Sequence, residues 1–288
     1  MILVTGAVGK TGRAVIQALA TRKVPVRAFV RRMEQVAAVQ RIGATEAIVG
    51  DLRNQDDLES ACQGIETLYH ICPNMQPDEV AIAERIFAAA KRSDIPRVVY
   101  HSVLHPQTAS MPHHWQKNRV EELLFTTGFD YTILQPAAYM QNVLASWQTI
   151  IEQGMYAVPY ALSTRLGMVD LHDVAEAAAF ILTTRNHSGA TYELATDEWL
   201  TQSEVAAILS EVLGRPVRAE VQPRQMWEQN ARSAGLSDYA IATLRNMFVY
   251  YERYGFCGNG NVLRWLLGRP PTRFADCMNR YVEQGRPR

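Results

Sequence analysis

The sequence predicts an α/β protein built on a doubly wound parallel sheet, with a smaller C-terminal α+β lobe. Three observations predict this fold. Short apolar runs alternate with segments of helical periodicity through the first half of the chain. A glycine triplet, Gly6-x-x-Gly9-x-x-Gly12, follows the first apolar run. The chain has 288 residues, 48% of them hydrophobic, which is enough for one large domain with an appended lobe.

The first half of the chain supplies the strands of the expected sheet and the helices between them. We expect strands at residues 2–5, 24–30, 46–49, 67–71, 97–100 and 131–134. We expect helices at residues 12–20, 33–42, 57–62, 80–91 and 117–126. Such alternation implies a parallel sheet that is covered on both faces and joined by right-handed crossovers. A ligand of such a sheet binds beyond the carboxyl ends of its strands.

The second half is less regular. We expect strands at residues 192–195 and 217–221, and a mostly helical stretch at 226–254 that is broken near Gly235. Asp173 and Thr201 each stand three residues before a glutamate and predict capping boxes at the starts of two helices. We therefore place the sheet domain at residues 1–150, together with part of 165–195, and the smaller lobe mainly at 151–288.

Composition argues against several classes of protein. Lys plus Arg and Asp plus Glu both number 29, so the neutral chain offers no global field for nucleic acid. The four cysteines form no Cys-x-x-Cys pair, which argues against zinc and suits a reducing cytoplasm. We expect neither a signal peptide before Ile2 nor a membrane span, since every long apolar run carries charges. His101 and His105 are four apart, but Pro106 follows and no carboxylate completes a ligand set, so we expect no metal.

The glycine triplet has a physical role between a strand and a helix. Gly6 permits a sharp turn, Gly9 lets the backbone approach a pyrophosphate, and Gly12 permits tight packing of the helix on the sheet. The helix N-terminus then directs N–H groups and a partial positive charge at the phosphates. A strand before and a helix after make the triplet a dinucleotide-binding signature. The expected contacts are Thr5, Gly6, Gly9, Lys10, Thr11 and Gly12.

Arginines after the second strand indicate which dinucleotide binds. NAD sites place a carboxylate there for the ribose 2′-hydroxyl, whereas Arg31 and Arg32 suit the 2′-phosphate of NADP. We therefore expect NADP(H) rather than NAD(H), with Arg31 as the main contact; the alternative is that both arginines are solvated charges. Asp51, after the third strand, either accepts a hydrogen bond from the adenine amino group or caps a turn.

The motifs TGAVGKTG, VRAFVRR, GDLRN, VVYHSV, MPHHWQK and YTILQPAAYMQN resemble those of the NmrA-like branch of the atypical short-chain dehydrogenases/reductases. The resemblance covers about residues 1–215 and is most specific over residues 131–142. It implies a Rossmann fold with a smaller C-terminal lobe and a preference for NADP(H). Some members resemble reductases of quinones, dyes or benzylic ethers, and others are non-catalytic NAD(P)-binding regulators that sense redox state and bind partner proteins.

The resemblance also implies candidate catalytic residues. Ordinary short-chain dehydrogenases use a serine after the fifth strand and a Tyr-x-x-x-Lys pair, in which the tyrosine is the acid/base and the lysine holds the nicotinamide ribose. Ser102 stands at the serine position, and Lys117 stands at the lysine position, where it begins a helix. His113 replaces the tyrosine. It either donates a proton, a role open also to its neighbour His114, or merely borders the pocket.

The turn after the sixth strand should face the nicotinamide end of a dinucleotide. We expect Pro136 and Ala137 to run beside the nicotinamide. Tyr139, Met140 and Asn142 then line a substrate pocket, unless the first two belong to the core. The C-terminal helices carry an aromatic-rich cluster that suits packing of the lobe or a dimer face better than a flat aromatic substrate. Its members are Trp227, Met247, Phe248, Tyr250, Tyr251 and Tyr254.

The leading hypothesis from the sequence is that the protein is an NADPH-dependent oxidoreductase that transfers hydride to a small quinone-like or aromatic substrate. Without the usual tyrosine, a substrate that needs little help with proton transfer, such as a quinone, is the easiest to accept. The alternative is a non-catalytic NAD(P)-sensing regulator that binds a protein partner. We expect a cytoplasmic protein that binds neither nucleic acid nor membrane, and a homodimer stays open.

Overall fold

The computed structural model describes residues 1–285 of the chain. The chain divides into two compact units. The first unit comprises Met1–Thr108, His113–Gln135 and Val174–Tyr192. The second comprises Ala109–Pro112, Pro136–Asp173 and the residues from Glu193 onward. The second unit thus includes Pro136, where the sixth strand ends.

The first unit is built on a seven-stranded sheet of order β10-β6-β5-β4-β1-β2-β3, which confirms the predicted fold class. Its strands are β1 (Ile2–Val4), β2 (Val26–Val30), β3 (Glu46–Val49), β4 (Thr67–His70), β5 (Arg97–His101), β6 (Asp130–Pro136) and β10 (Ala190–Leu194). The strand pairs among β1 to β6 are parallel, and Val4 of β1 lies beside Ala28 of β2 and Tyr69 of β4. The order turns between β1 and β4, so a ligand crevice is expected beyond the carboxyl ends of these two strands.

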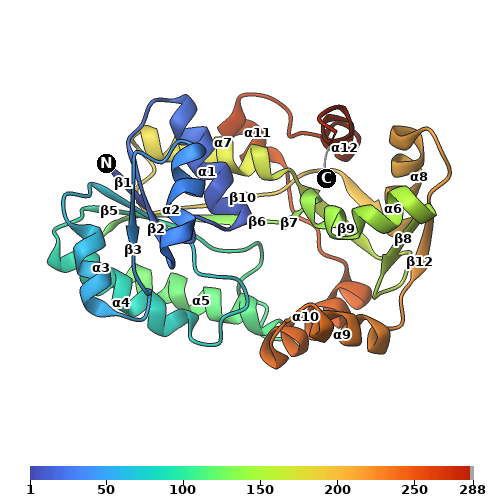
Figure 1. Ribbon diagram of the computed structural model, residues 1–288, viewed down its shortest axis with the longest axis horizontal. Coiled ribbons are helices and arrows are strands. Elements are labelled where there is room, and N and C mark those ends of the chain that lie inside the picture. The colour runs from blue at the N-terminus through green and yellow to red at the C-terminus, as the bar shows by residue number, and fades with distance from the viewer. Residues whose placement is uncertain (286–288) are drawn as a thin grey trace. The chain divides into compact units, whose positions relative to one another are not determined.

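Helices cover both faces of this sheet. They are α1 (Lys10–Thr21), α2 (Val36–Arg41), α3 (Gln55–Cys62), α4 (Glu79–Arg92), α5 (Pro112–Phe125) and α7 (Leu171–Thr183), with a short 3₁₀ turn η1 (Met33–Gln35). In Figure 1, α1 and α7 lie above the strands, and α3, α4 and α5 lie below them. On the lower face, Leu3, Leu68 and Val98 of three neighbouring strands share one buried cluster with Ile82 and Ile86 of α4. Burial of these apolar side chains holds the sheet edge that carries the site.

Two predicted helix starts are wrong. The fifth helix begins at Pro112 rather than at Lys117, because proline suits the first helical position, where no N–H bond is needed. The helix α7 begins at Leu171, so Asp173 lies inside its first turn instead of capping it. The Asp173 carboxylate accepts hydrogen bonds from Thr272 and Arg269 instead. The second predicted capping box is confirmed, since Thr201 and Glu204 bond reciprocally.

The second unit contains two small sheets and a set of helices. Strands β11 (Trp199–Thr201), β9 (Arg165–Val169) and β7 (Ala138–Tyr139) form one sheet, and β12 (Arg218–Val221) pairs with β8 (Met155–Val158) in the other. The helices are α6 (Trp147–Gln153), α8 (Gln202–Leu213), α9 (Arg224–Ser233), α10 (Asp238–Tyr254), α11 (Asn261–Leu267) and α12 (Phe274–Glu283), after a 3₁₀ segment η2 (Met140–Ser146). The predicted break near Gly235 is confirmed between α9 and α10. The strands β7, β8, β9 and β11 are absent from the predicted set.

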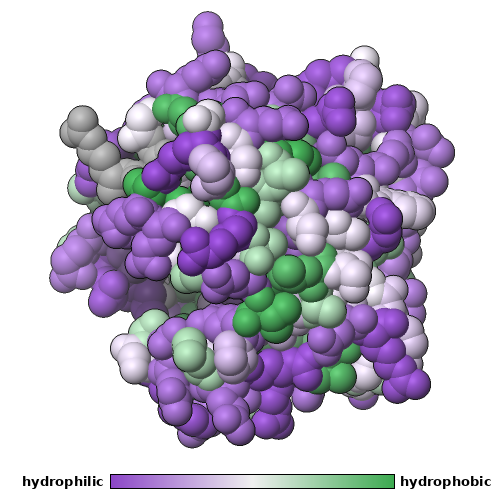
Figure 2. Space-filling view, turned by 90° about the vertical axis from the view of Figure 1, so that its right-hand side faces the viewer, coloured by the Kyte–Doolittle hydropathy of each residue, from purple (hydrophilic) through white to green (hydrophobic). Residues whose placement is uncertain are grey.

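Aromatic side chains form the interior of this second unit. Trp227 meets Phe248 edge-on at 4.7 Å between ring centroids, and Tyr251 stacks on Phe256 at 4.9 Å. Phe248 and Tyr251 are buried, so the predicted role of the aromatic-rich cluster in packing the lobe is confirmed for them. On the face that carries α8 and β12, Figure 2 shows an apolar band flanked by hydrophilic residues.

Candidate functional site

The glycine loop connects β1 to α1 and leaves the start of the helix open. Gly6 has φ +61°, which other residues adopt only with strain, and a Cβ there would lie 2.9 Å from the carbonyl oxygen of Ile71. Gly9 is the N-cap of α1 and makes no side-chain capping bond. Both Gly9 and Lys10 are exposed. The positive end of a 12-residue helix is thereby open to an anion, so the loop fits the pyrophosphate of a dinucleotide.

Gly12 lies against the loop itself. A Cβ on Gly12 would stand 2.3 Å from the carbonyl oxygen of Gly6 and 2.8 Å from Cα of Ala7. The predicted reason for this glycine, packing of the helix on the sheet, is therefore wrong. The loop folds back across the first turn of α1, and only a residue without a side chain leaves room for it.

Thr5 fixes the loop to the neighbouring strand. Its side chain is fully buried, and its hydroxyl donates to the Ile71 carbonyl at 3.1 Å and accepts from the Ile71 N–H at 2.9 Å. The same oxygen lies 2.9 Å from Nδ1 of His70. A ligand contact through this hydroxyl would have to break these bonds. Thr5 thus shapes the loop, whereas the exposed backbone of Gly9 and Lys10 faces outward.

The predicted adenosine end gathers charged side chains after β2 and β3. The Arg31 side chain is 74% exposed, and its Nη2 lies 4.0 Å from Oδ2 of Asp51. The backbone N–H groups of Arg31 and Arg32 both donate to Oε1 of Gln35, which fixes the turn after β2. Asp51 Oδ1 accepts from the Arg53 N–H at 2.9 Å, so this carboxylate caps a turn. Arg31 is free to swing toward a phosphate because it is held only by a long, exposed ion pair.

The helix α5 carries a row of polar side chains on its buried face. His113, Lys117 and Glu121 follow one another at intervals of four residues, which places them above one another along the helix. His113 and Glu121 are buried, and the Lys117 side chain is 13% exposed. The correction of the helix start explains this row, because a helix that began at Lys117 would leave His113 outside it.

Lys117 lies at the carboxyl end of β5. Its Nζ donates to Oε1 of Glu79 at 2.7 Å and to the carbonyl of His101 at 3.4 Å. Glu79 is the first residue of α4, is only 2% exposed, and also accepts from the Tyr100 hydroxyl at 3.0 Å. The ammonium also lies 5.5 Å from the centroid of the Tyr100 ring. Lys117 is therefore held by a buried ion pair at the sheet edge where the nicotinamide half of a dinucleotide is expected.

The Ser102 side chain is hydrogen-bonded to Glu121. Its hydroxyl donates to Oε1 of Glu121, and Nε2 of Gln135 donates to both carboxylate oxygens at 2.9 and 3.0 Å. Burial raises the pKa of Glu121, and the bonds from Ser102 and Gln135 oppose that rise. Ser102 is itself buried, so its contacts serve to join β5, β6 and α5.

His113 stands where the acid/base tyrosine is expected. Burial, and secondarily the neighbouring His114 and Lys117, lowers the pKa of His113 to about 2. The ring is therefore neutral at physiological pH and is no imidazolium donor. Its Nδ1 is buried without a hydrogen-bond partner among the described residues 1–285. The His113 ring packs edge-on against the His114 ring, with 4.3 Å between the ring centroids.

The predicted pocket residues belong to the second unit. Pro136 is buried at the end of β6, and Tyr139 is half-buried in β7. Met140 is fully buried, which fits the alternative that it belongs to the core, and Asn142 is exposed. Their roles toward a substrate stay predictions.

Two partners of the candidate residues, Glu121 and Glu79, were not predicted from the sequence. Glu121 lies four residues after Lys117, so the helical spacing alone gave a signal for it. Glu79 gave none, because it lies 38 residues from Lys117 along the chain and meets it only through the packing of α4 beside α5.

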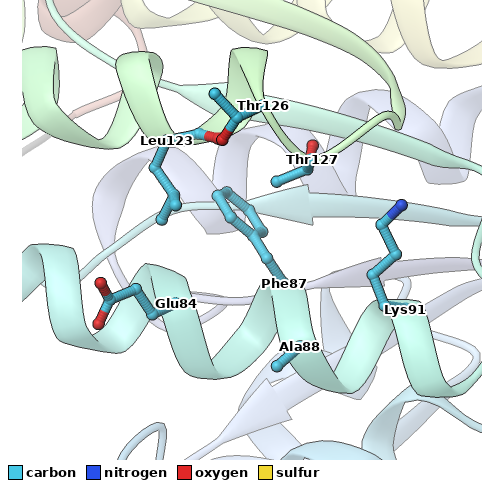
Figure 3. A pocket seen from close by; sticks show the side chains of 7 residues that line it. All are labelled: Glu84, Phe87, Ala88, Lys91, Leu123, Thr126 and Thr127. Atoms are coloured by element: carbon cyan, nitrogen blue, oxygen red, sulfur yellow. The ribbon is translucent and has the colours of Figure 1, made fainter.

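A surface groove between α4 and α5 lies away from this site. It measures about 330 Å³ and is lined by Glu84, Phe87, Ala88, Lys91, Leu123, Thr126 and Thr127 (Figure 3). These residues come from the later turns of α4 and from the end of α5. Since both helices run antiparallel to the strands, the groove faces the amino ends of the strands, opposite the ligand edge. It therefore does not belong to the site around Lys117.

The sheet topology and the open glycine loop define a protein of the Rossmann class. Within that class, the chain belongs to the NmrA-like family, whose profile matches residues 1–274. Among residues 1–285, no helix has the length and apolar character needed to cross a bilayer, and no group of three metal-binding side chains is found.

Relatives and solved structures cover nearly the whole chain. Quinone oxidoreductase 2 of Escherichia coli is 28% identical over 97% of this chain and 98% of its own length. NAD(P)H azoreductase of Xenophilus azovorans is 27% identical over 96% of both chains. The crystal structure of an NADPH-dependent quinone oxidoreductase from Escherichia coli complexed with NADPH is 28% identical, covers 97% of this chain and 99% of its own, and superposes with a TM-score of 0.84. The Citrobacter sp. triphenylmethane reductase complexed with NADP(H) is 25% identical at the same coverage, with a TM-score of 0.83.

Proposed function

We propose that this chain is an NADP(H)-dependent reductase that transfers hydride to a small quinone-like or aromatic substrate. The observation that carries the proposal is the uncapped, exposed start of α1 with the exposed Arg31 guanidinium after the adjacent strand β2. The reductases of quinones, azo compounds and triphenylmethane dyes among the similar proteins support the substrate class.

Each part of the site has a role toward the cofactor. The loop from Gly6 to Gly12 would hold the pyrophosphate, and Arg31, with Arg32 beside it, would hold the 2′-phosphate. Lys117 would bind the nicotinamide ribose at the carboxyl end of β5. When bound, the cofactor supplies hydride, and the chain supplies position and charge.

Among the residues that the structure describes, the site lacks an obvious general acid to protonate a substrate. His113 is neutral and the Ser102 hydroxyl is bonded to Glu121, so neither is set up as the acid of an ordinary short-chain dehydrogenase. A substrate that becomes a stabilised anion on receiving hydride needs no such acid, because water can protonate it afterwards. A quinone has this property, and a simple ketone does not. This asymmetry favours quinone-like substrates over ordinary carbonyls.

A substrate panel tests the proposed function. Purified protein is mixed with NADPH and, in turn, with benzoquinones, an azo dye, a triphenylmethane dye and a simple ketone, and NADPH absorbance is followed. We expect consumption with quinones or dyes and none above background with the ketone. Tight NADPH binding without turnover on any acceptor would contradict the reductase and favour the cofactor-sensing regulator.

Replacing Arg31 by alanine is expected to weaken binding of NADPH about tenfold or more while leaving NADH nearly unchanged, because a charge-assisted bond to the 2′-phosphate is lost. Titration of each nucleotide by fluorescence measures this ratio. Arg22, exposed at the opposite end of α1, provides the matched alanine control and should alter neither affinity. An equal loss for NADH and NADPH in the Arg31 variant would overturn the assignment.

A further inference from the structure

The ion pair between Lys117 and Glu79 is deeply buried at the ligand edge of the first unit. The Glu79 carboxylate is 2% exposed and the Lys117 side chain 13%. Oε1 of Glu79 accepts from both Nζ of Lys117 at 2.7 Å and the Tyr100 hydroxyl at 3.0 Å. The carboxylate also lies in the first turn of the 14-residue helix α4, where the helix dipole favours negative charge.

A buried pair of this kind is costly unless both charges are well satisfied. Moving a carboxylate and an ammonium out of water costs more than a single hydrogen bond returns, so such a pair is weak evidence for stability alone. Here Glu79, at the start of α4, and Lys117 of α5 meet at the end of β5, and the His101 carbonyl is a further acceptor for Nζ. The arrangement leaves the ammonium few other positions.

We propose that Glu79 is a positioning residue that holds the Lys117 ammonium at the carboxyl end of β5 for the ribose of the nicotinamide half. The inference rests on the proposed function, because it assigns Glu79 a part in the same site. In a lysine without this partner, the four-carbon side chain would explore many rotamers and would pay their entropy on binding the cofactor. Glu79 fixes the ammonium beforehand and so lowers the cost of binding.

A merely structural ion pair makes a different prediction. Removing one partner of a buried pair destabilises the fold, because the other charge is left uncompensated, whereas replacing both by apolar residues is often neutral. If the pair served only to stabilise the fold, its loss would affect NADPH binding only through stability, and stability should recover in the double variant Glu79→Leu/Lys117→Met. If Glu79 positions Lys117 for the cofactor, stability should recover in this variant but NADPH affinity should not, because the ammonium is gone.

The experiment measures the melting temperature and the NADPH dissociation constant of the full chain and its variants. We expect Glu79→Gln and Lys117→Met each to weaken NADPH binding about tenfold, and the double variant Glu79→Gln/Lys117→Met to bind no worse than Lys117→Met alone. Glu79→Asp keeps the charge and should recover part of the affinity. It also serves as the test if Glu79→Gln fails to fold.

A matched control comes from the opposite end of α4, the helix that carries Glu79. Glu59 of α3 pairs with Arg92 in the last turn of α4 at 2.7 Å, far from the site, so Glu59→Gln should leave NADPH affinity unchanged. Wild-type affinity in both Glu79→Gln and Glu79→Asp would overturn the positioning role and leave the proposed function intact. Additive losses in the double variant would overturn it as well. A wild-type chain that does not bind NADPH would instead overturn the proposed function.

Discussion

Replacing Gly12 by alanine is expected to abolish tight NADPH binding and to destabilise the first unit. The new Cβ, fixed to the first turn of α1, would stand 2.3 Å from the Gly6 carbonyl oxygen, which belongs to the loop backbone, so no flexible side chain can move aside. Overpacking of this kind costs about 1–3 kcal/mol. Because alanine in a helix is otherwise about 1 kcal/mol more favourable than glycine, a net loss of stability would identify the overlap as its cause.

The same substitution at Gly9 separates loop geometry from ligand approach. A Cβ on Gly9 meets only the Gly6 carbonyl oxygen, at 3.2 Å, and Gly9 has an ordinary φ of −69°. The free energy of unfolding of Gly9→Ala should therefore lie within about 1 kcal/mol of the wild-type value. Its NADPH affinity should still fall, because the methyl group would stand where the pyrophosphate approaches. Urea unfolding and fluorescence titration give the two quantities. Wild-type NADPH affinity in Gly9→Ala would refute the phosphate role of the loop.

The elements of the sheet unit were predictable because their signals are local. A strand buried on both faces shows as an apolar run, and the glycine triplet shows by spacing alone. The error at α5 arose because Pro112 suits either a loop or a first helical turn, and the sequence does not decide between them. The small strands β7, β8, β9 and β11 were not predicted from the sequence.

The family resemblance singled out Ser102 and Lys117 as candidate catalytic residues, but their partners in the fold decide what they can do. The Ser102 hydroxyl donates its hydrogen bond to Glu121, and the Lys117 ammonium is paired with Glu79. Contacts between segments 19 and 38 residues apart depend on how α4 and α5 dock on the sheet. Residue spacing does not encode the contact between Glu79 and Lys117, and the burial that keeps His113 neutral is likewise visible only in the fold.

Acidification below neutral pH is expected to unfold the first unit at unusually mild pH. Burial lowers the pKa of His70 and His101 to about 3, of His113 to about 2 and of His114 to about 4. An unfolded histidine takes up its proton near pH 6.5, so below that pH the unfolded chain binds more protons than the folded one, and stability falls as pH falls. The contribution is complete above about pH 6.5 and is lost progressively toward the folded pKa values.

The size of this effect follows from the number of rings. Below pH 6.5, each ring that stays neutral in the fold lowers the free energy of unfolding by up to about 1.4 kcal/mol per pH unit, and the four rings together by up to about 6 kcal/mol per pH unit, against a typical domain stability of about 5–15 kcal/mol. Glu121, whose pKa is raised, acts with the opposite sign and offsets only part of the loss. The unit should therefore unfold between about pH 4 and 5.5, which circular dichroism across the pH range would show.

One variant isolates the histidine contribution. His113→Leu removes a ring that is neutral and buried in the folded state, so the slope of unfolding free energy against pH should fall by about a quarter. The exposed His172 gives the control His172→Gln, which leaves the four buried rings in place. Urea unfolding at several pH values between about 5 and 7 measures both slopes. A stability that stays flat across that window would show that these rings take up protons equally in the folded and unfolded chain, and would overturn the neutral state inferred for His113.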